Sequence, residues 1–192
     1  MATAGQFKVH PSTFKDYILD DIDIYDVRYP TSDFSHGSDA VHIAPDYSAA
    51  YIHLKFNHRH SSSTPPLVGH GMTFSLGRGT EIICACIQSM FPFVKGMSFG
   101  EITANPLSFS AKLSNDSQMR WLGPEKGVIH LASAAFNNAI FDLWSWCYNK
   151  PLWRFLAEMD TDELVDKCVD FKYLTDVLDV ESVRTELRSK VV

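Results

Sequence analysis

The sequence predicts an α+β fold in which a three-stranded antiparallel meander packs on a helical bundle. Three runs rich in β-branched and aromatic residues come first, and the second half of the chain has the apolar spacing of helices. Strands followed by helices are typical of the α+β class. With 192 residues, of which 45% are hydrophobic and 21% charged, the chain has the composition of an ordinary globular protein.

The predicted strands cover residues 22–29, 47–56 and 67–76, and turn-forming residues bound each of them. In the second strand Ile52 and Leu54 alternate with polar side chains, which gives the sheet an apolar face. The third strand also alternates, and its apolar positions are Met72, Phe74 and Leu76. One face of the sheet therefore needs a cover.

Five helices are predicted to supply that cover. Their ranges are 80–94, 105–113, 127–148, 152–158 and 161–167. The third is the longest and has a wide apolar face, so we expect it to be the central core helix. Pro106 occupies the first position of the second helix, and Asp160 precedes the last with Glu163 in capping-box spacing.

Beyond these helices the pattern of strand and helix begins again. Residues 170–176 look like one more strand, and residues 180–190 look like a helix with Val183 and Leu187 as its apolar positions. A lone strand and helix after a finished unit are typical of the start of another domain. The chain is accordingly divided into an N-terminal extension (1–20), a sheet-plus-helix domain (21–168) and the start of a truncated second domain (169–192).

Charge and composition exclude several classes of function. The net charge is −6 and the basic residues are scattered, so no cluster is available to bind nucleic acid. No apolar stretch reaches the roughly 18 residues that a membrane-spanning helix needs. A reducing compartment suits the four cysteines, whose spacings match no zinc or redox motif. The N-terminus lacks signal-peptide features and carries Asp16 and Asp20, so we expect a cytoplasmic protein.

The connection at residues 31–46 is the first candidate functional segment. It is rich in Ser, Asp, His, Gly and Pro and is longer than a hairpin loop of about two to five residues. Loops of this kind are lids or binding loops, or else disordered segments. Four consecutive residues offer a donor, a flexible backbone, a hydroxyl and a carboxylate: His36, Gly37, Ser38 and Asp39. Such a set can hydrogen-bond a polyol.

Two other patterns have a structural interpretation beside a functional one. His58 and His60 form an H-x-H pair, with His53 and His70 on nearby strands, and neutral imidazoles bind metals. No acidic or cysteine partner completes that site, so solvated histidines are the simpler interpretation. Residues 77–81 join a strand to a helix N-terminus, where N–H groups can hold an anion. Because a phosphate-loop spacing is missing, a tight turn with a helix cap is the simpler interpretation.

Seven segments carry a resemblance to a known family. They are 26–32 (DVRYPTS), 37–40 (GSDA), 45–51 (PDYSAAY), 71–81 (GMTFSLGRGTE), 115–127 (NDSQMRWLGPEKG), 149–153 (NKPLW) and 170–176 (DFKYLTD). Together they resemble the L-fuconate dehydratase family of the enolase superfamily, including mitochondrial members close to it. The resemblance extends from Ile22 to the end of the chain.

The resemblance implies an enolase-superfamily N-terminal capping domain, which closes over the mouth of a (β/α)8-type barrel. By matching position it implies substrate contacts at four residues: Gly37, Ser38, Asp39 and Tyr47. In such enzymes a Lys or His base removes the proton next to the carboxylate of a sugar acid such as L-fuconate, and Mg²⁺ stabilises the enediolate. The catalytic and metal-binding residues of the family lie on barrel strands, so the resemblance assigns none of them here.

Two alternative functions follow from the resemblance. The sequence has no Lys-x-Lys motif, and a complete barrel takes about 250 residues, far more than follow Lys172. We therefore expect a truncated L-fuconate dehydratase-like protein that binds no Mg²⁺ alone and is inactive without a barrel. The alternative is a non-catalytic module that docks on a barrel half or on a full-length relative. A mitochondrial location is the alternative to the cytoplasm.

Overall fold

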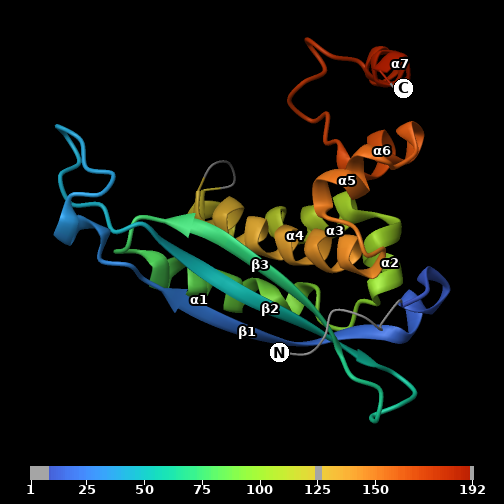
Figure 1. Cartoon of the computed structure of the whole chain (residues 1–192), viewed down its shortest axis with the longest axis horizontal. Coiled ribbons are helices and arrows are strands. Elements are labelled where there is room, and N and C mark those ends of the chain that lie inside the picture. Colours follow the sequence, from blue (N-terminus) through green and yellow to red (C-terminus); the bar gives the residue numbers. More distant parts are fainter. Residues whose placement is uncertain (1–8, 124–126, 191–192) are drawn as a thin grey trace.

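A three-stranded antiparallel sheet in the order β1-β2-β3 forms the base of the molecule (Figure 1). The computed structural model describes residues 9–123 and 127–190. In it β1 spans Tyr17–Val27, β2 spans Ser48–His58 and β3 spans Leu67–Ser75. The meander predicted from the sequence is therefore confirmed.

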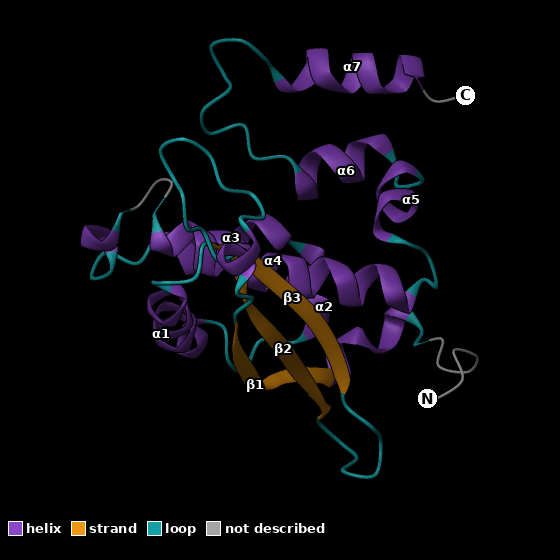
Figure 2. Cartoon of the chain, turned by 60° about the vertical axis from the view of Figure 1, so that its left-hand side comes forward, coloured by secondary structure: helices purple, strands orange, loops and turns teal. Residues whose placement is uncertain are grey.

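Helices α1 and α4 lie against one face of this sheet (Figure 2). The described helices are α1 (Thr80–Met90), α2 (Phe99–Ala104), α3 (Pro106–Ser114), α4 (Val128–Cys147), α5 (Leu152–Ala157), α6 (Thr161–Cys168) and α7 (Val180–Lys190). Short 3-10 turns occupy Pro11–Asp16, Thr31–Phe34, Phe91–Phe93 and Arg120–Leu122. This arrangement confirms the α+β class.

Helix α4 is the central core helix, as predicted. Its stripe of buried apolar residues comprises Ala132, Ala135, Phe136, Ala139, Ile140, Leu143 and Cys147. These side chains share one hydrophobic cluster with Ile52, Leu54 and Phe56 of β2. Burial of each large apolar side chain contributes about 1.5–3 kcal/mol. Within the described ranges no helix, α4 included, is long and apolar enough to cross a membrane.

After Leu67, the inward face of β3 is made of the small residues Gly69, Gly71 and Thr73, which corrects the alternation expected from the sequence. Met72 and Phe74 point to the uncovered face, where they are 37% and 50% exposed. Gly69 and Gly71 face α4 instead: a Cβ at Gly71 would lie 2.0 Å from the carbonyl oxygen of Ala135. At Gly69 and Gly71 the helix backbone approaches β3 so closely that it leaves no room for an inward side chain.

Side chains of α4 also bond the outer edge of β3. The Nδ2 of Asn138 donates to the carbonyl of Met72 at 2.8 Å, and the backbone N–H of His70 donates to Asp142 Oδ2 at 3.0 Å. These contacts take the place that a fourth strand would have at this edge.

Two helix starts follow the predicted capping chemistry. Asn105 accepts a hydrogen bond from the N–H of Ser108 at 2.9 Å, directly before Pro106, and α3 begins there. Asp160 accepts from the N–H groups of Asp162 and Glu163 at the start of α6. The side chain of Glu163 instead pairs with Lys167, so it does not complete the expected capping box. A complete capping box caps the short helix α2, which was not predicted.

The first strand begins earlier than predicted. Residues 17–19 and Asp21 already pair with β2, and the register shifts at Asp20. The charged Asp20 and Asp21 hide the apolar alternation in the sequence. Tyr17 and Leu19 are buried, and so is Phe14 in the preceding 3-10 turn. This part of the predicted N-terminal extension therefore packs within the core.

The strand predicted at 170–176 is absent from the described structure, where residues 172–177 form turns. A strand needs a neighbour to bond its backbone, and no described strand lies beside this segment. The predicted helix at the end of the chain is present as α7, which has no buried residue.

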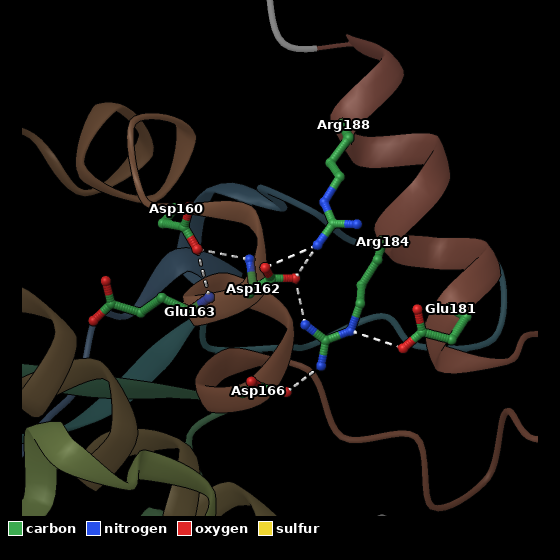
Figure 3. A network of polar contacts seen from close by, with 7 residues as sticks. All are labelled: Asp160, Asp162, Glu163, Asp166, Glu181, Arg184 and Arg188. Atoms are coloured by element: carbon green, nitrogen blue, oxygen red, sulfur yellow. Dashed lines mark hydrogen bonds and ion pairs between the residues drawn. The ribbon is translucent and has the colours of Figure 1, made fainter.

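A network of charged side chains holds α7 beside α6 (Figure 3). Arg184 donates to Asp162 and Asp166 at 2.5 Å each, and Arg188 donates to Asp162 at 2.6 Å. The Nε of Arg184 lies 3.4 Å from Glu181 Oε1, a charge contact without hydrogen-bond geometry. Charge, rather than apolar burial, therefore makes this contact.

Candidate functional site

Residues 31–47, here called the lid loop, extend beyond one end of the sheet between β1 and β2 (Figure 1). The loop opens with the 3-10 turn Thr31–Phe34 and returns to the sheet at Ser48. Its length and polarity predicted a lid or a disordered segment. The hydrogen bonds within it define a folded loop.

Hydrogen bonds close the base of the lid loop. The hydroxyl of Thr31 donates to the carbonyl of Pro45 and accepts from the N–H of Tyr47, both at 2.9 Å. The backbone N–H and hydroxyl of Ser32 both donate to Asp46 Oδ1, at 3.1 and 2.7 Å. The hydroxyl of Ser32 therefore lowers the pKa of Asp46 below its ordinary value, with the backbone N–H adding to the effect.

Two of the four predicted contact residues touch each other. The hydroxyl of Tyr47 donates to the carbonyl of Gly37 at 3.1 Å. Gly37 has φ = +74°, and a Cβ there would lie 1.9 Å from Cε2 of Tyr47. The glycine is thus required by both its backbone conformation and its contact with the ring. The ring of Tyr47 also packs 5.6 Å, centroid to centroid, from that of Phe74.

The other two predicted residues shape the tip of the loop. The hydroxyl of Ser38 donates to the carbonyl of Ile43 at 2.8 Å. Asp39 Oδ1 accepts from the N–H groups of Val41 and His42, both at 2.7 Å. These backbone hydrogen bonds, that of His42 first, lower the pKa of Asp39 and keep it ionised at neutral pH. Asp39 nevertheless remains exposed and can still accept hydrogen bonds from a ligand.

The β3–α1 turn, residues 76–79, lies beside the base of the lid loop. The N–H of Asp46 donates to the carbonyl of Leu76 at 3.3 Å. Gly77 and Gly79 both have positive φ, and helix α1 begins immediately after them. The tight turn expected at 77–81 is present, and Gly79 is the N-cap residue of α1, without a side-chain cap hydrogen bond.

Arg28 ties the start of the lid loop to the first turn of α1. It binds both carboxylate oxygens of Asp26 at 2.8 Å and also contacts Glu81. Arg28, Ser32 and Asp46 lie within the family-like segments of the sequence, but no role was predicted for any of them. The sequence feature they share is that each is a polar residue near one end of a long loop.

The four histidines of the possible metal site form two separate pairs. The rings of His53 and His70 are 4.5 Å apart on the uncovered face of the sheet, and His53 Nδ1 lies 3.6 Å from Asp23. His58 and His60 lie near the C-terminal end of β2, with ring centroids 6.1 Å apart. Across residues 9–123 and 127–190, no group of three His, Cys, Asp or Glu residues has the geometry to hold a metal ion.

The cysteines offer no reactive thiol in the described structure. Cys86 and Cys147 are buried, Cys84 and Cys168 are half-buried, and all four are free. Burial raises the pKa of Cys147 to about 12 and raises the pKa values of the other three thiols. Thiols of this kind stay protonated and unreactive at neutral pH.

Two clefts of the molecule lie away from the lid loop. A cleft of about 520 Å³ is bounded by α3, residues 114–120, His130 and residues 170–173. A second, of about 390 Å³, lies along β3 and the C-terminal half of α4. None of the four predicted contact residues lines either cleft.

Comparison with known proteins places this fold among larger relatives. No family model matches the chain. Mitochondrial enolase superfamily member 1 of Bos taurus is 46% identical over 171 residues, which are 89% of this chain and 37% of that protein. L-galactonate dehydratase of Hypocrea jecorina is 47% identical over 165 residues, 86% of this chain and 35% of that protein. The chain spans little more than a third of the length of these relatives.

Solved structures agree with the sequence matches. The crystal structure of human mitochondrial enolase superfamily member 1 has a TM-score of 0.80 at 40% identity and covers 90% of this chain and 38% of that one. An L-talarate/galactarate dehydratase variant solved with Mg and L-glucarate has a TM-score of 0.50 at 13% identity, covering 98% of this chain and 52% of that one, which bears on the fold alone. The chain belongs to the enolase superfamily and matches its N-terminal capping region.

Proposed function

We propose that this chain is the substrate-capping part of a sugar-acid dehydratase of the L-fuconate or L-galactonate type. The proposal rests on one observation: the four family-matched residues gather in a single folded polar loop at one end of the sheet. In this proposal the lid loop covers a sugar acid held by a barrel domain. The catalytic groups belong to that barrel.

The electrostatics of Asp39 suggest which part of the ligand it meets. Its lowered pKa keeps a negative charge at the tip of the loop. Two carboxylates repel each other, so Asp39 would accept hydrogen bonds from sugar hydroxyls rather than approach the acid group. Gly37 and Tyr47 would contribute the backbone and the ring surface beside it.

Mg²⁺ would be held elsewhere in the complete enzyme. The resemblance implies this ion, and the L-talarate/galactarate dehydratase variant carries it together with L-glucarate. The described residues of this chain do not fit it, because they contain no cluster of three suitable ligands. When bound to the barrel, the ion would stabilise the enediolate of the sugar acid. The proposed location is the cytoplasm, with the mitochondrion as the alternative.

Complementation tests the proposal. The purified chain is mixed with a separately supplied barrel half, Mg²⁺ and either L-fuconate or L-galactonate, and the 2-keto product is followed. We expect product only when both halves are present, and the better of the two substrates identifies the sugar acid. Product from the chain alone would overturn the assignment of catalysis to the barrel.

In the reconstituted enzyme, Asp39→Ala should weaken use of the substrate. Loss of one hydrogen bond from a charged acceptor corresponds to about 1.5–3 kcal/mol, so kcat/KM should fall at least about tenfold. Asp33→Ala removes the same charge from the same loop and serves as the matched control, which we expect to be silent. If Asp39→Ala and Asp33→Ala have the same kcat/KM, Asp39 is not a contact residue.

A second candidate, a non-catalytic module that docks on a barrel, is favoured by the apolar residues of the lid loop. Phe34, Val41 and Ile43 are each at least 75% exposed. Exposed apolar side chains clustered in one loop are typical of interaction sites. Tight binding of a barrel half without any dehydration would select this function, whereas dehydration in the mixture would select the enzyme.

A further inference from the structure

Asp46 lies where three segments of the chain meet. Its carboxylate accepts both hydrogen bonds of Ser32 at the start of the lid loop. Its backbone N–H reaches Leu76 in the β3–α1 turn, and its carbonyl accepts from the hydroxyl of Ser48 at 2.7 Å, where β2 begins. One half-buried residue thus joins both ends of the lid loop to the neighbouring turn.

The β3–α1 turn is fitted closely to this residue. Gly77 has φ = +100°, and a Cβ there would lie 2.9 Å from the Cβ of Asp46. Arg28 provides a second tie, since it links the end of β1 to Glu81 in the first turn of α1. The base of the lid loop and the turn therefore form one packed unit.

The contacts of Asp46 extend to the predicted ligand-contact residues. Tyr47 follows Asp46 directly, its N–H is bonded by Thr31, and its hydroxyl bonds Gly37. Tyr47 therefore connects the base of the loop to its middle, whereas the side chain of Asp46 bonds Ser32.

We propose that Asp46 is a positioning residue, which holds the lid loop and the β3–α1 turn as one preassembled unit. A loop that is already ordered loses little conformational freedom when it meets a ligand, so its contacts are used for affinity. The role of this unit toward a sugar acid rests on the proposed function. Its preassembly is a property of the chain itself.

Amide hydrogen exchange on the full chain tests the preassembly directly. In Asp46→Ala, the lid loop should exchange about tenfold faster, because the hydrogen bonds from Ser32 to the carboxylate are lost. The turn should also exchange about tenfold faster, because the backbone N–H of Asp46, which bonds Leu76, is then no longer held in place. Asp33→Ala, the matched loop control, should leave both unchanged. The amides of α4 and β3 report whether each variant is folded. If Asp46→Ala speeds amide exchange in the lid loop alone, or in neither segment, the loop and the turn are not one unit and the proposal is wrong.

Asp46→Asn keeps an oxygen acceptor for Ser32 and guards against a variant that fails to fold. It should restore most of the protection that Asp46→Ala removes. Protection as poor as that of Asp46→Ala would show that hydrogen bonding through Oδ1 is not what holds the unit together, which would also overturn the proposal.

The reconstituted enzyme separates positioning from general damage. Asp46→Ala should raise KM about tenfold with kcat nearly unchanged, because the loop would then have to become ordered when the substrate binds. Asp46→Asn should restore KM. An equal fall in kcat with KM unchanged would contradict the positioning role. If no sugar acid is turned over even by the unchanged sequence, the proposed function fails, and the exchange experiment still decides the preassembly.

Discussion

Gly71 marks the place where β3 and α4 come closest. A Cβ added there would lie 2.0 Å from the carbonyl oxygen of Ala135 and 2.7 Å from the backbone nitrogen of Ala139. Both neighbours are backbone atoms of a long core helix, so they cannot rotate away as a flexible side chain would. The strand or the helix has to shift instead.

We predict that Gly71→Ala lowers the free energy of unfolding by about 3 kcal/mol, at the upper end of ordinary overpacking. Urea unfolding measures the change. Gly79→Ala is the matched control: it has φ = +99° but no atom within 4 Å of the added Cβ. It should cost only roughly 1–2 kcal/mol of backbone strain. A smaller loss for Gly71→Ala than for Gly79→Ala would show that the sheet and helix can separate easily.

Only some residues and contacts of the candidate site could be predicted from the sequence. The lid loop and the set Gly37, Ser38 and Asp39 could be found, because a long polar loop between strands is itself a signal. The hydrogen bonds from Ser32 to Asp46 and from Tyr47 to Gly37 could not. Each joins residues more than nine positions apart in irregular chain, where no period relates one partner to the other.

At the scale of elements, the contact between α6 and α7 is unusual because it is made by charge. Arg184 and Arg188 both bind Asp162, and their hydrogen bonds, that of Arg184 first, lower the pKa of Asp162 below its ordinary value. A carboxyl with a lowered folded pKa stabilises the contact above its ordinary pKa, and the stabilisation is lost as the pH falls through the lowered value. Salt should weaken the same contact.

We expect α7 to separate from α6 in about 1 M NaCl, where the Debye length is about 3 Å. Acid should have the same effect below the ordinary carboxyl range. NMR order parameters of the α7 amides would fall while those of α4 stay constant. Arg184→Ala should reproduce the effect at low salt. Lys190→Ala removes a charge whose pair among the described residues, Glu186, lies within α7, and it is the control. Unchanged order parameters in salt would mean that apolar packing holds α7 after all.

Elements with a local signal were predicted well, and those defined by distant partners were not. The apolar period of α4 and the caps of α3 and α6 lie within a few residues, so the sequence reports them. The inward face of β3 was missed because Gly69 and Gly71 give no hydrophobic signal. The segment 170–176 has the composition of a strand, but the described part of the chain supplies no neighbouring strand for it.

On the scale of the whole molecule, we expect the core to fold independently of residues 170–192, here called the C-terminal arm. Among the described residues, the core cluster and the side chains packed against it end at Met159, and α7 contributes no buried residue. We predict that deletion of residues 170–192 changes the free energy of unfolding of the remaining chain by less than about 1 kcal/mol. Thermal and urea unfolding would test this. A loss of several kcal/mol would show that the arm is part of the cooperative unit.

The bonding of the β3 edge by α4 has a consequence during synthesis. Asn138 and Asp142 follow their partners Met72 and His70 by 66 and 72 residues. A chain emerging from the ribosome presents β3 long before the helix that covers its edge has been translated. During that interval the edge can pair with another nascent copy, as any open strand can. The folded protein is protected at this edge, so chaperones would be needed most while translation is under way.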